Sequence, residues 1–177
     1  MVIGCGAVGL AAVQGARLAG AAKIIAVDID DGKLALAQRM GATQGVNNKQ
    51  EVAAIARRET FGRGADVVIE AAGSAAAFRT SIEAVRPGGE VVWLGKIDVN
   101  TDVTFRWGAL MQEKRIRRSS YGEARPARDF PMLAQAYLDG RLMLDELITQ
   151  RIRLDAINQG FSALRDGKAI RSVITFG

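Results

Sequence analysis

The sequence has no histidine, one cysteine and three prolines among its 177 residues. Without histidine, the chain cannot itself supply an imidazole general base, a histidine ligand to a metal or a Ser-His-Asp triad. Because Cys5 is its only cysteine, it also cannot form an intrachain disulfide or a cysteine-cluster zinc site. A site built from carboxylates alone stays open, but no tight cluster of Asp and Glu indicates one. We therefore expect no metal-binding residue in this chain.

Long hydrophobic runs are missing as well. No apolar segment reaches the roughly 18 residues that a transmembrane helix needs. The N-terminus also lacks the basic segment and following apolar segment of a secretory signal, and a single cysteine is typical of a reducing compartment. We expect a cytoplasmic protein with no membrane partner.

The formal net charge is +5 at pH 7, and the basic residues are densest between Lys114 and Arg128. Proteins that bind single-stranded nucleic acids combine such charges with aromatic side chains on which bases stack. Tyr121 is the only aromatic residue in this stretch. We therefore expect a solvated surface or a face covered by a protein partner, and no nucleic-acid partner. Part of the excess charge can be matched to phosphate groups.

Strand-like and helix-like segments alternate from residue 1 to about residue 95. This alternation is typical of a parallel sheet wound with helices. The first strand is expected at Val2 and Ile3. Apolar β-rich runs predict further strands at 23–28, 65–70 and 90–95, and a weaker signal predicts one at 44–47. Pro87-Gly88-Gly89 is expected to form the turn before the strand at 90–95. Helical patterns follow the first turn and occupy about 31–40, 51–61 and 74–85. From residue 96 onward the patterns are weaker and predict an edge strand at 115–121, a helix at 127–138, a strand at 147–154, a helix at 155–165 and a strand at 169–176.

The turn Gly4-Cys5-Gly6-Ala7-Val8-Gly9 follows the first β-run and opens a helix. In this pattern Gly4 makes the turn, Gly6 lets the backbone approach a pyrophosphate, and Gly9 lets the helix pack on the strand. Asp28 ends the second strand about 20 residues further on, where an acidic residue accepts hydrogen bonds from the adenosine ribose. A carboxylate there repels a 2′-phosphate, so the sequence predicts a bound dinucleotide, with NAD favoured over NADP.

Together these signals predict an α/β fold: a Rossmann-type doubly wound parallel sheet with a C-terminal α+β extension. Only three residues precede Gly4, so we expect the first strand to be truncated and the chain to be part of a larger protein. Cys5 is interpreted as an inert loop residue, although a helix N-terminus can lower the pKa of a nearby thiol.

S-adenosylmethionine methyltransferases also carry a glycine loop and a ribose-binding acid. They usually have an acidic residue shortly before the first glycine, where this chain has Val2 and Ile3. They also tend to have a polar-proline loop after the fourth strand, where this chain has Glu70-Ala71-Ala72-Gly73. Both departures disfavour that alternative.

Over essentially its whole length, the sequence resembles the C-terminal, cofactor-binding portion of the zinc-dependent medium-chain alcohol dehydrogenases. The resemblance rests on motifs in a fixed order, at residues 4–10, 24–29, 40–43, 64–70, 86–89, 128–131, 147–149 and 157–161. It implies that residues 1–121 form the NAD-binding domain and that residues 122–177 return to a catalytic domain. It also implies a homodimer or larger species that associates through the edge strand at 115–121.

The resemblance also implies a set of cofactor-binding residues. They are Gly4, Gly6, Ala7, Val8 and Gly9 at the pyrophosphate, Asp28, Ile29 and Lys33 at the adenosine ribose, Ala71 and Ala72 after the fourth strand, Leu94, Gly95 and Lys96 along the nicotinamide, Ser119 and Tyr121 at the nicotinamide end, and Arg171 at the pyrophosphate. On the residues alone, Ala71 and Leu94 fit core positions equally well, and Lys33 and Arg171 also fit a solvated surface.

In this family the zinc ligands and the proton-relay hydroxyl lie upstream of the glycine loop. The resemblance therefore implies no catalytic residue here, no zinc bound by this chain and no turnover by the chain alone. The whole enzyme would interconvert a small alcohol and an aldehyde by hydride transfer to or from NAD, with zinc polarising the oxygen. The alternative is a free-standing NAD-binding regulatory module without chemistry of its own.

Overall fold

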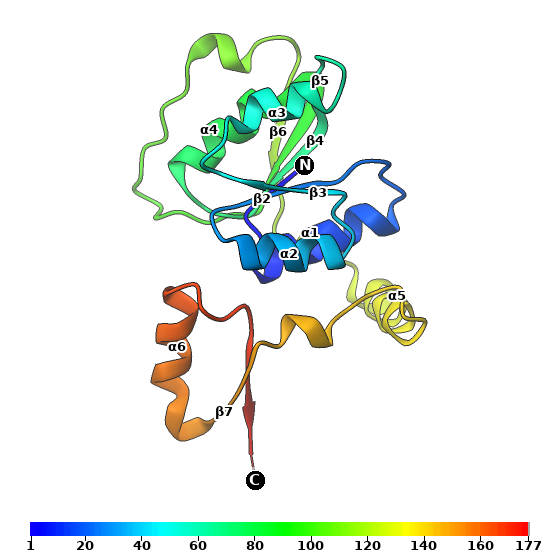
Figure 1. Cartoon of the computed structure of the whole chain (residues 1–177), viewed down its shortest axis with the longest axis vertical. Coiled ribbons are helices and arrows are strands. Elements are labelled where there is room, and N and C mark those ends of the chain that lie inside the picture. The colour runs from blue at the N-terminus through cyan, green and yellow to red at the C-terminus, as the bar shows by residue number, and fades with distance from the viewer. Residues whose placement is uncertain (177) are drawn as a thin grey trace. The chain divides into compact units, whose positions relative to one another are not determined.

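The computed structural model describes residues 1–176 (Figure 1). They divide into two compact units, Met1–Ala124 and a second unit that begins at Arg125. Among the described residues, no helix is both long enough and apolar enough to cross a membrane.

The first unit is built on a six-stranded sheet with the order β3-β2-β1-β4-β5-β6. All of its strand pairs are parallel. The strands are β1 (Val2–Ile3), β2 (Ile25–Asp28), β3 (Gln44–Asn47), β4 (Ala65–Glu70), β5 (Val85–Trp93) and β6 (Arg115–Arg118). The order reverses between β1 and β4, which is the switch point of a doubly wound fold. The predicted fold class is confirmed, and β6 lies at the sheet edge as expected.

Four helices connect these strands: α1 (Ala7–Leu18), α2 (Asp31–Arg39), α3 (Val52–Arg58) and α4 (Ala75–Ala84). Helix α3 lies beside α4 (Figure 1). Two helices have side-chain caps, because Asp30 accepts from the Lys33 amide at 3.0 Å and Ser74 accepts from the Ala77 amide at 3.1 Å. Helix α1 begins at Gly6 without a side-chain cap and without an acid in its first turn.

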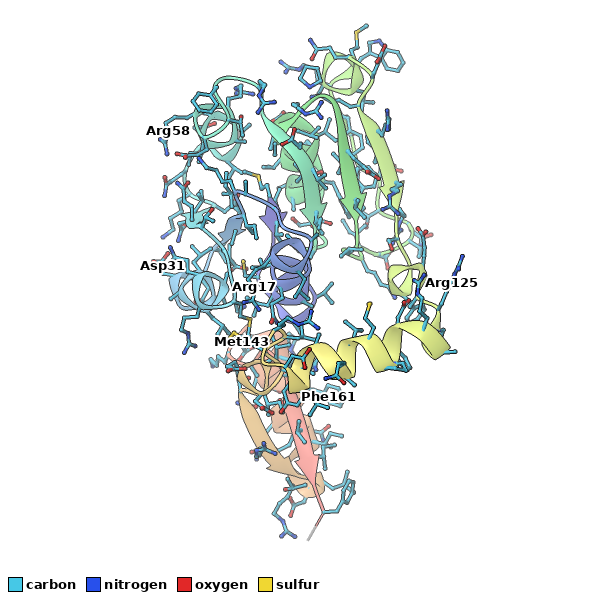
Figure 2. The ribbon with its side chains drawn as sticks, turned by 90° about the vertical axis from the view of Figure 1, so that its right-hand side faces the viewer. Arg17, Asp31, Arg58, Arg125, Met143 and Phe161 are labelled. Carbon is cyan, nitrogen blue, oxygen red and sulfur yellow. The ribbon has the colours of Figure 1, made fainter. Side chains whose placement is uncertain are left out.

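Helices α1 and α2 also touch at their far ends. A Cβ added to Gly41, just after α2, would lie 2.5 Å from Cδ of Arg17 in the last turn of α1. At the other end of α2, Asp31 accepts a 2.8 Å hydrogen bond from the Asn47 side chain on β3. Figure 2 labels Arg17 and Asp31 on these two neighbouring helices. The second and third strands are thereby fixed relative to the first.

The core of this unit lies along the central strands. Ile3, Val27, Val68 and Val91 come from β1, β2, β4 and β5 and are all buried. An apolar run of this kind is what a parallel strand covered on both faces requires. Trp93, at the end of β5, packs edge-on against Phe78 of α4, with the ring centroids 5.0 Å apart.

Several element boundaries differ from the sequence prediction; for example, the strands expected at 147–154 and 169–176 span Gln150–Arg153 and Ser172–Thr175. Helix α3 ends at Arg58 rather than near residue 61, and β6 ends at Arg118 rather than at residue 121. Strand β5 begins at Val85, so the expected turn at Pro87-Gly88-Gly89 lies inside it as a bulge. The register jumps there from Ala65 opposite Val85 to Val67 opposite Glu90.

The basic stretch between residues 114 and 128 is partly paired within the chain. Arg117 forms ion pairs with Glu90 at 2.5 Å and with Glu123 at 2.9 Å. The Lys114 ammonium donates to the Ile82 carbonyl at 2.7 Å. Arg117 and Lys114 therefore hold the edge of the sheet to its neighbours, and Arg117 stays partly in solvent, as a solvated surface would require.

The second unit contains α5 (Pro126–Leu138), β7 (Gln150–Arg153), α6 (Ile157–Arg165) and β8 (Ser172–Thr175). Strands β7 and β8 pair in parallel, with Gln150 opposite Ser172, and α6 connects them. A Cβ on Gly160 would lie 2.6 Å from Cδ1 of Ile152, so α6 approaches β7 closely. Phe161, labelled in Figure 2, remains 62% exposed on α6. That this unit packs on a catalytic domain stays a prediction.

Candidate dinucleotide-binding site

Nearly all of the expected cofactor-binding residues follow the carboxyl ends of parallel strands in the first unit. The glycine loop follows β1, Asp28 ends β2, Ala71 follows β4, Leu94 follows β5 and Ser119 follows β6. The carboxyl ends of parallel strands share one edge of the sheet, so the fold brings these segments to one edge. In doubly wound folds, ligands bind outside this edge at the switch point.

The three glycines of the loop differ in what surrounds them. Gly4 has a φ of +92°, and a Cβ on it would lie 2.7 Å from the Ala72 amide nitrogen. A Cβ on Gly9 would collide with the Gly4 carbonyl oxygen. A Cβ on Gly6 would meet nothing within 4 Å. Gly4 and Gly9 are therefore required by close packing, whereas Gly6 faces open space.

That open space lies at the N-terminus of α1. The first amides of a helix have no partner within it, and the helix dipole favours an anion at this end. Helix α1 has neither a side-chain cap nor an acidic residue in its first turn, whereas side chains cap α2 and α4. A glycine loop that opens such a helix fits a pyrophosphate.

Asp28 is held beside this loop by two backbone amides. Its Oδ2 accepts a 2.6 Å hydrogen bond from the Cys5 amide, and its Oδ1 accepts a 3.0 Å hydrogen bond from the Asp30 amide. Each oxygen retains further accepting capacity, because a carboxylate offers about four lone-pair sites. The adjacent Ile29 is 74% exposed, and Lys33 lies in the first turn of α2. The end of β2 can therefore receive the hydroxyls of a ribose.

Cys5 does not act as a nucleophile in this loop. Burial, followed by the nearby negative charge of Asp28, raises the pKa of its thiol to about 12. The sulfur lies 3.7 Å from the Val27 carbonyl oxygen and is fully buried. The helix N-terminus does not lower this pKa, so the interpretation as an inert loop residue holds.

Backbone hydrogen bonds continue the sheet past the ends of β4, β5 and β6. The Ala71 amide donates to the Ile3 carbonyl at 2.8 Å, and the Ser119 amide donates to the Trp93 carbonyl at 3.2 Å. The Leu94 amide donates at 2.8 Å to the carbonyl of Glu70. These bonds set the expected contact residues of the nicotinamide half side by side.

Glu70 is a residue of this site that the sequence did not single out. Its side chain is fully buried, and Oε1 accepts from the amides of Ala72 at 2.8 Å and Gly73 at 2.7 Å. Its Oε2 has no hydrogen-bond partner among the described residues. Burial raises the pKa of Glu70 above its ordinary value, and the amides of Gly73 and Ala72 oppose that rise. The available signal was an acid that ends an apolar strand and is followed by three small residues.

The loop after β4 and the loop after β5 meet backbone to backbone. A Cβ on Gly73 would lie 2.9 Å from the Lys96 nitrogen, and a Cβ on Gly95 would lie 2.5 Å from the Gly73 nitrogen. The same Cβ on Gly95 would collide with Oε2 of Glu70. Only glycine fits at these two positions, and the two loops form a continuous surface.

All of the expected cofactor contacts stay predictions, including those of Tyr121, Lys96 and Arg171. Tyr121 is 94% exposed and Lys96 is also exposed. Arg171 belongs to the second unit, where its carbonyl accepts from the Thr149 amide at 3.0 Å. Within residues 1–176, no group of three or more His, Cys, Asp or Glu residues could hold a metal ion, so no zinc chemistry is derived for this chain.

Comparison with known proteins decides the family. Residues 7–138 match the family model described as zinc-binding dehydrogenase. The chain belongs to the zinc-binding dehydrogenase family. It matches the C-terminal portion that carries the cofactor-binding fold, and this membership favours the dehydrogenase interpretation over the methyltransferase one.

Similar curated proteins are alcohol dehydrogenases. The chain is 36% identical to the NDMA-dependent alcohol dehydrogenase of Amycolatopsis methanolica, with 98% of the chain and 48% of that protein covered. It is 33% identical to alcohol dehydrogenase-like 6 of Arabidopsis thaliana, with 98% of the chain and 46% of that protein covered. The chain thus spans about half the length of the curated relatives it matches.

Solved structures agree with this assignment. A zinc-binding domain alcohol dehydrogenase protein from Burkholderia ambifaria has a TM-score of 0.93 and 34% identity over 99% of this chain and 48% of its own. Benzyl alcohol dehydrogenase from Acinetobacter calcoaceticus also has a TM-score of 0.93, at 30% identity over 99% of this chain and 49% of its own. A zinc-binding dehydrogenase from Sinorhizobium meliloti 1021 was solved bound to NADP. It has 33% identity and a TM-score of 0.80 over 91% of this chain and 47% of its own. That relative therefore binds a nicotinamide dinucleotide.

Proposed function

We propose that this chain binds NAD and positions its nicotinamide within a zinc-type alcohol dehydrogenase that interconverts a small alcohol and an aldehyde. One observation carries the proposal: the 2.6 Å hydrogen bond from the Cys5 amide to Asp28. It joins the anion-binding loop to the ribose-binding acid, which are the two ends of an adenosine diphosphate site. Family membership supplies the reaction class.

Different residues of the chain bind different parts of the cofactor. The amides of Gly6, Ala7 and Val8 bind the pyrophosphate at the start of α1, and Asp28 accepts hydrogen bonds from the adenosine ribose, with Ile29 and Lys33 beside it. In a doubly wound fold, the β4–β6 half receives the second mononucleotide. Residues 94–96 and the loop after β4 therefore border the nicotinamide, with Ser119 and Tyr121 at its far end and Arg171 reaching toward the pyrophosphate.

The bound dinucleotide supplies the hydride acceptor, and the protein supplies orientation. The parallel strands place the segments after β4 and β5 side by side, so these segments would hold the nicotinamide, which would supply the hydride chemistry. Orientation of this kind contributes to catalysis because it removes the entropic cost of bringing reactants together. The chain itself moves no proton and holds no metal in this account.

The proposal includes a preference for NAD over NADP. Asp28 presents a carboxylate where the 2′ substituent of the ribose would lie, and a phosphate dianion there meets repulsion. The known NADP-bound relative shows that the family also accepts the other cofactor. The preference for NAD over NADP therefore rests on the negative charge of Asp28.

Calorimetric titration of the full chain tests the function. NADH, NADPH and S-adenosylmethionine are titrated into the wild type, the Asp28→Ala variant and the Asp31→Asn variant. We expect NADH to bind more tightly than NADPH, and Asp28→Ala to weaken NADH about tenfold. Asp31→Asn is the matched control, since it also removes one carboxylate at the start of α2 and should leave NADH affinity within about twofold. Binding of S-adenosylmethionine alone would overturn the proposal.

A further inference from the structure

The carboxylate of Glu70 is unusual for its position. It stands at the end of β4, next to the switch point of the sheet, and its side chain is 0% exposed. No salt bridge of the described residues includes it, and its Oε2 accepts no hydrogen bond from them. Burying an acid without a countercharge is unfavourable. The fold nevertheless buries the Glu70 carboxylate.

Glu70 binds the loop after β4 through its side chain. Its Oε1 receives the amides of Ala72 at 2.8 Å and Gly73 at 2.7 Å. Two amides converging on one oxygen fix the direction of this loop, which turns sharply at Gly73 with a φ of +69°. An apolar side chain would leave both amides without this partner.

Glu70 also binds the segment after β5, through its backbone. Its carbonyl accepts from the amides of Leu94 at 2.8 Å and Gly95 at 3.0 Å. Oε2 also lies so close to Gly95 that a Cβ there would collide with it. A single residue thereby fixes both loops and the contact between them.

We propose that Glu70 is a positioning residue for the nicotinamide half of the cofactor site. Its carboxylate holds residues 71–73 and Gly95 as one rigid surface on which the nicotinamide ring lies. This inference rests on the proposed function, since it assigns the β4–β6 half of the fold to that part of the cofactor. The adenosine half, with Asp28 and the glycine loop, does not depend on it.

The test compares two ligands that differ only in the nicotinamide ring, because ADP-ribose keeps both riboses and the pyrophosphate. NADH and ADP-ribose are titrated into the full chain carrying wild-type Glu70, Glu70→Gln or Glu70→Ala. We expect Glu70→Ala to weaken NADH about tenfold, which corresponds to about 1.4 kcal/mol. ADP-ribose affinity should stay within about twofold. Glu70→Gln retains the accepting oxygen for Ala72 and Gly73, so it should lose less.

Val68→Ala is the matched structural control. Val68 lies on the same strand, is equally buried, and contacts the core rather than the loops. Its truncation should lower the melting temperature without changing the ratio of the NADH and ADP-ribose affinities. Nicotinamide fluorescence provides a second readout, because the emission shift of bound NADH should be lost in Glu70→Ala and kept in Val68→Ala.

If Glu70→Ala fails to melt cooperatively, the comparison of NADH and ADP-ribose is made on Glu70→Gln, which should weaken NADH and leave ADP-ribose affinity unchanged. Equal weakening of both ligands, or of neither, in the folded variants overturns the inference, as does a wild type that binds ADP-ribose and NADH equally tightly. A folded wild type that binds neither ligand overturns the proposed function and the inference together.

Discussion

The Cys5 amide donates a 2.6 Å hydrogen bond to Oδ2 of Asp28, across 23 residues of sequence. The bond ties the glycine loop after β1 to the acid that ends β2. It explains why the loop and the acid have a fixed spacing in dinucleotide-binding folds, because the carboxylate shapes the loop before any ligand arrives. Because the loop is already ordered, less conformational entropy is lost when a ligand binds.

Gly6→Ala and Gly9→Ala should separate binding from folding. A Cβ at Gly6 meets open space, and its φ of −72° suits alanine. Gly6→Ala should therefore keep the wild-type melting temperature and lose NADH binding, since the methyl group occupies the phosphate position. Gly9→Ala should be destabilised by about 1–3 kcal/mol, because its methyl group collides with the Gly4 carbonyl. Thermal melts and NADH titrations on both variants check this, and full NADH affinity in Gly6→Ala would contradict it.

The buried carboxylate of Glu70 should make stability depend on pH in a defined direction. Burial raises its pKa above the ordinary value of 4.5 in the folded state. Below pH 4.5 it is protonated in both states and has no effect. As pH rises through the window from 4.5 to the folded pKa, the unfolded chain ionises first, so the free energy of unfolding falls, and above that window the loss is constant.

Glu70→Gln removes this titration, so urea denaturation of both proteins across pH 4.5 to pH 8 isolates it. The stability of the variant relative to the wild type should increase as pH rises and then level off. The carboxylate of Asp66, whose pKa is lowered by Arg86, is present in both proteins and cancels. A difference that stays flat, or that shrinks with rising pH, would show that Glu70 is not buried as described.

The thiol of Cys5 should resist alkylation in the native state. Its pKa of about 12 leaves almost no thiolate at neutral pH, and the sulfur is buried. Iodoacetamide at pH 7.5 should therefore label the folded chain at least about a hundredfold more slowly than the urea-unfolded chain. Mass spectrometry of timed samples measures both rates. Similar rates would contradict the geometry around Val27 and Asp28.

Much of the fold could be predicted from sequence because the central strands and the helix ends carry strong local signals. Strand β4 begins and ends where its apolar run does, and Asp30 and Gly41 mark the two ends of α2, whereas the signal for β3 is weak. Strand β5 was predicted too short, because the backbone keeps pairing at Val85 before the Pro87-Gly88-Gly89 bulge. A proline and two glycines resemble a turn, and only the neighbouring strand shows that they form a bulge.

The candidate site was predictable in part. The glycine loop and Asp28 have a spacing with a direct physical meaning, and the structure places Asp28 against the loop. Glu70 carries only a general signal, an acid at the end of an apolar strand, because its partners are the amides of residues 72 and 73, and amides leave no mark in the sequence. Its contact with Gly95 depends on the register of β4 and β5, which local patterns do not set.

The amide NMR spectrum of the ¹⁵N-labelled chain during titration with NADH shows directly where the dinucleotide binds. We expect the shifts to concentrate at the carboxyl edge of the sheet, in residues 6–9, 28–30, 71–73 and 94–96. ADP-ribose should shift the first two groups and leave the last two nearly unchanged. Shifts confined to the second unit, or spread evenly over α3 and α4, would contradict a dinucleotide site at this edge.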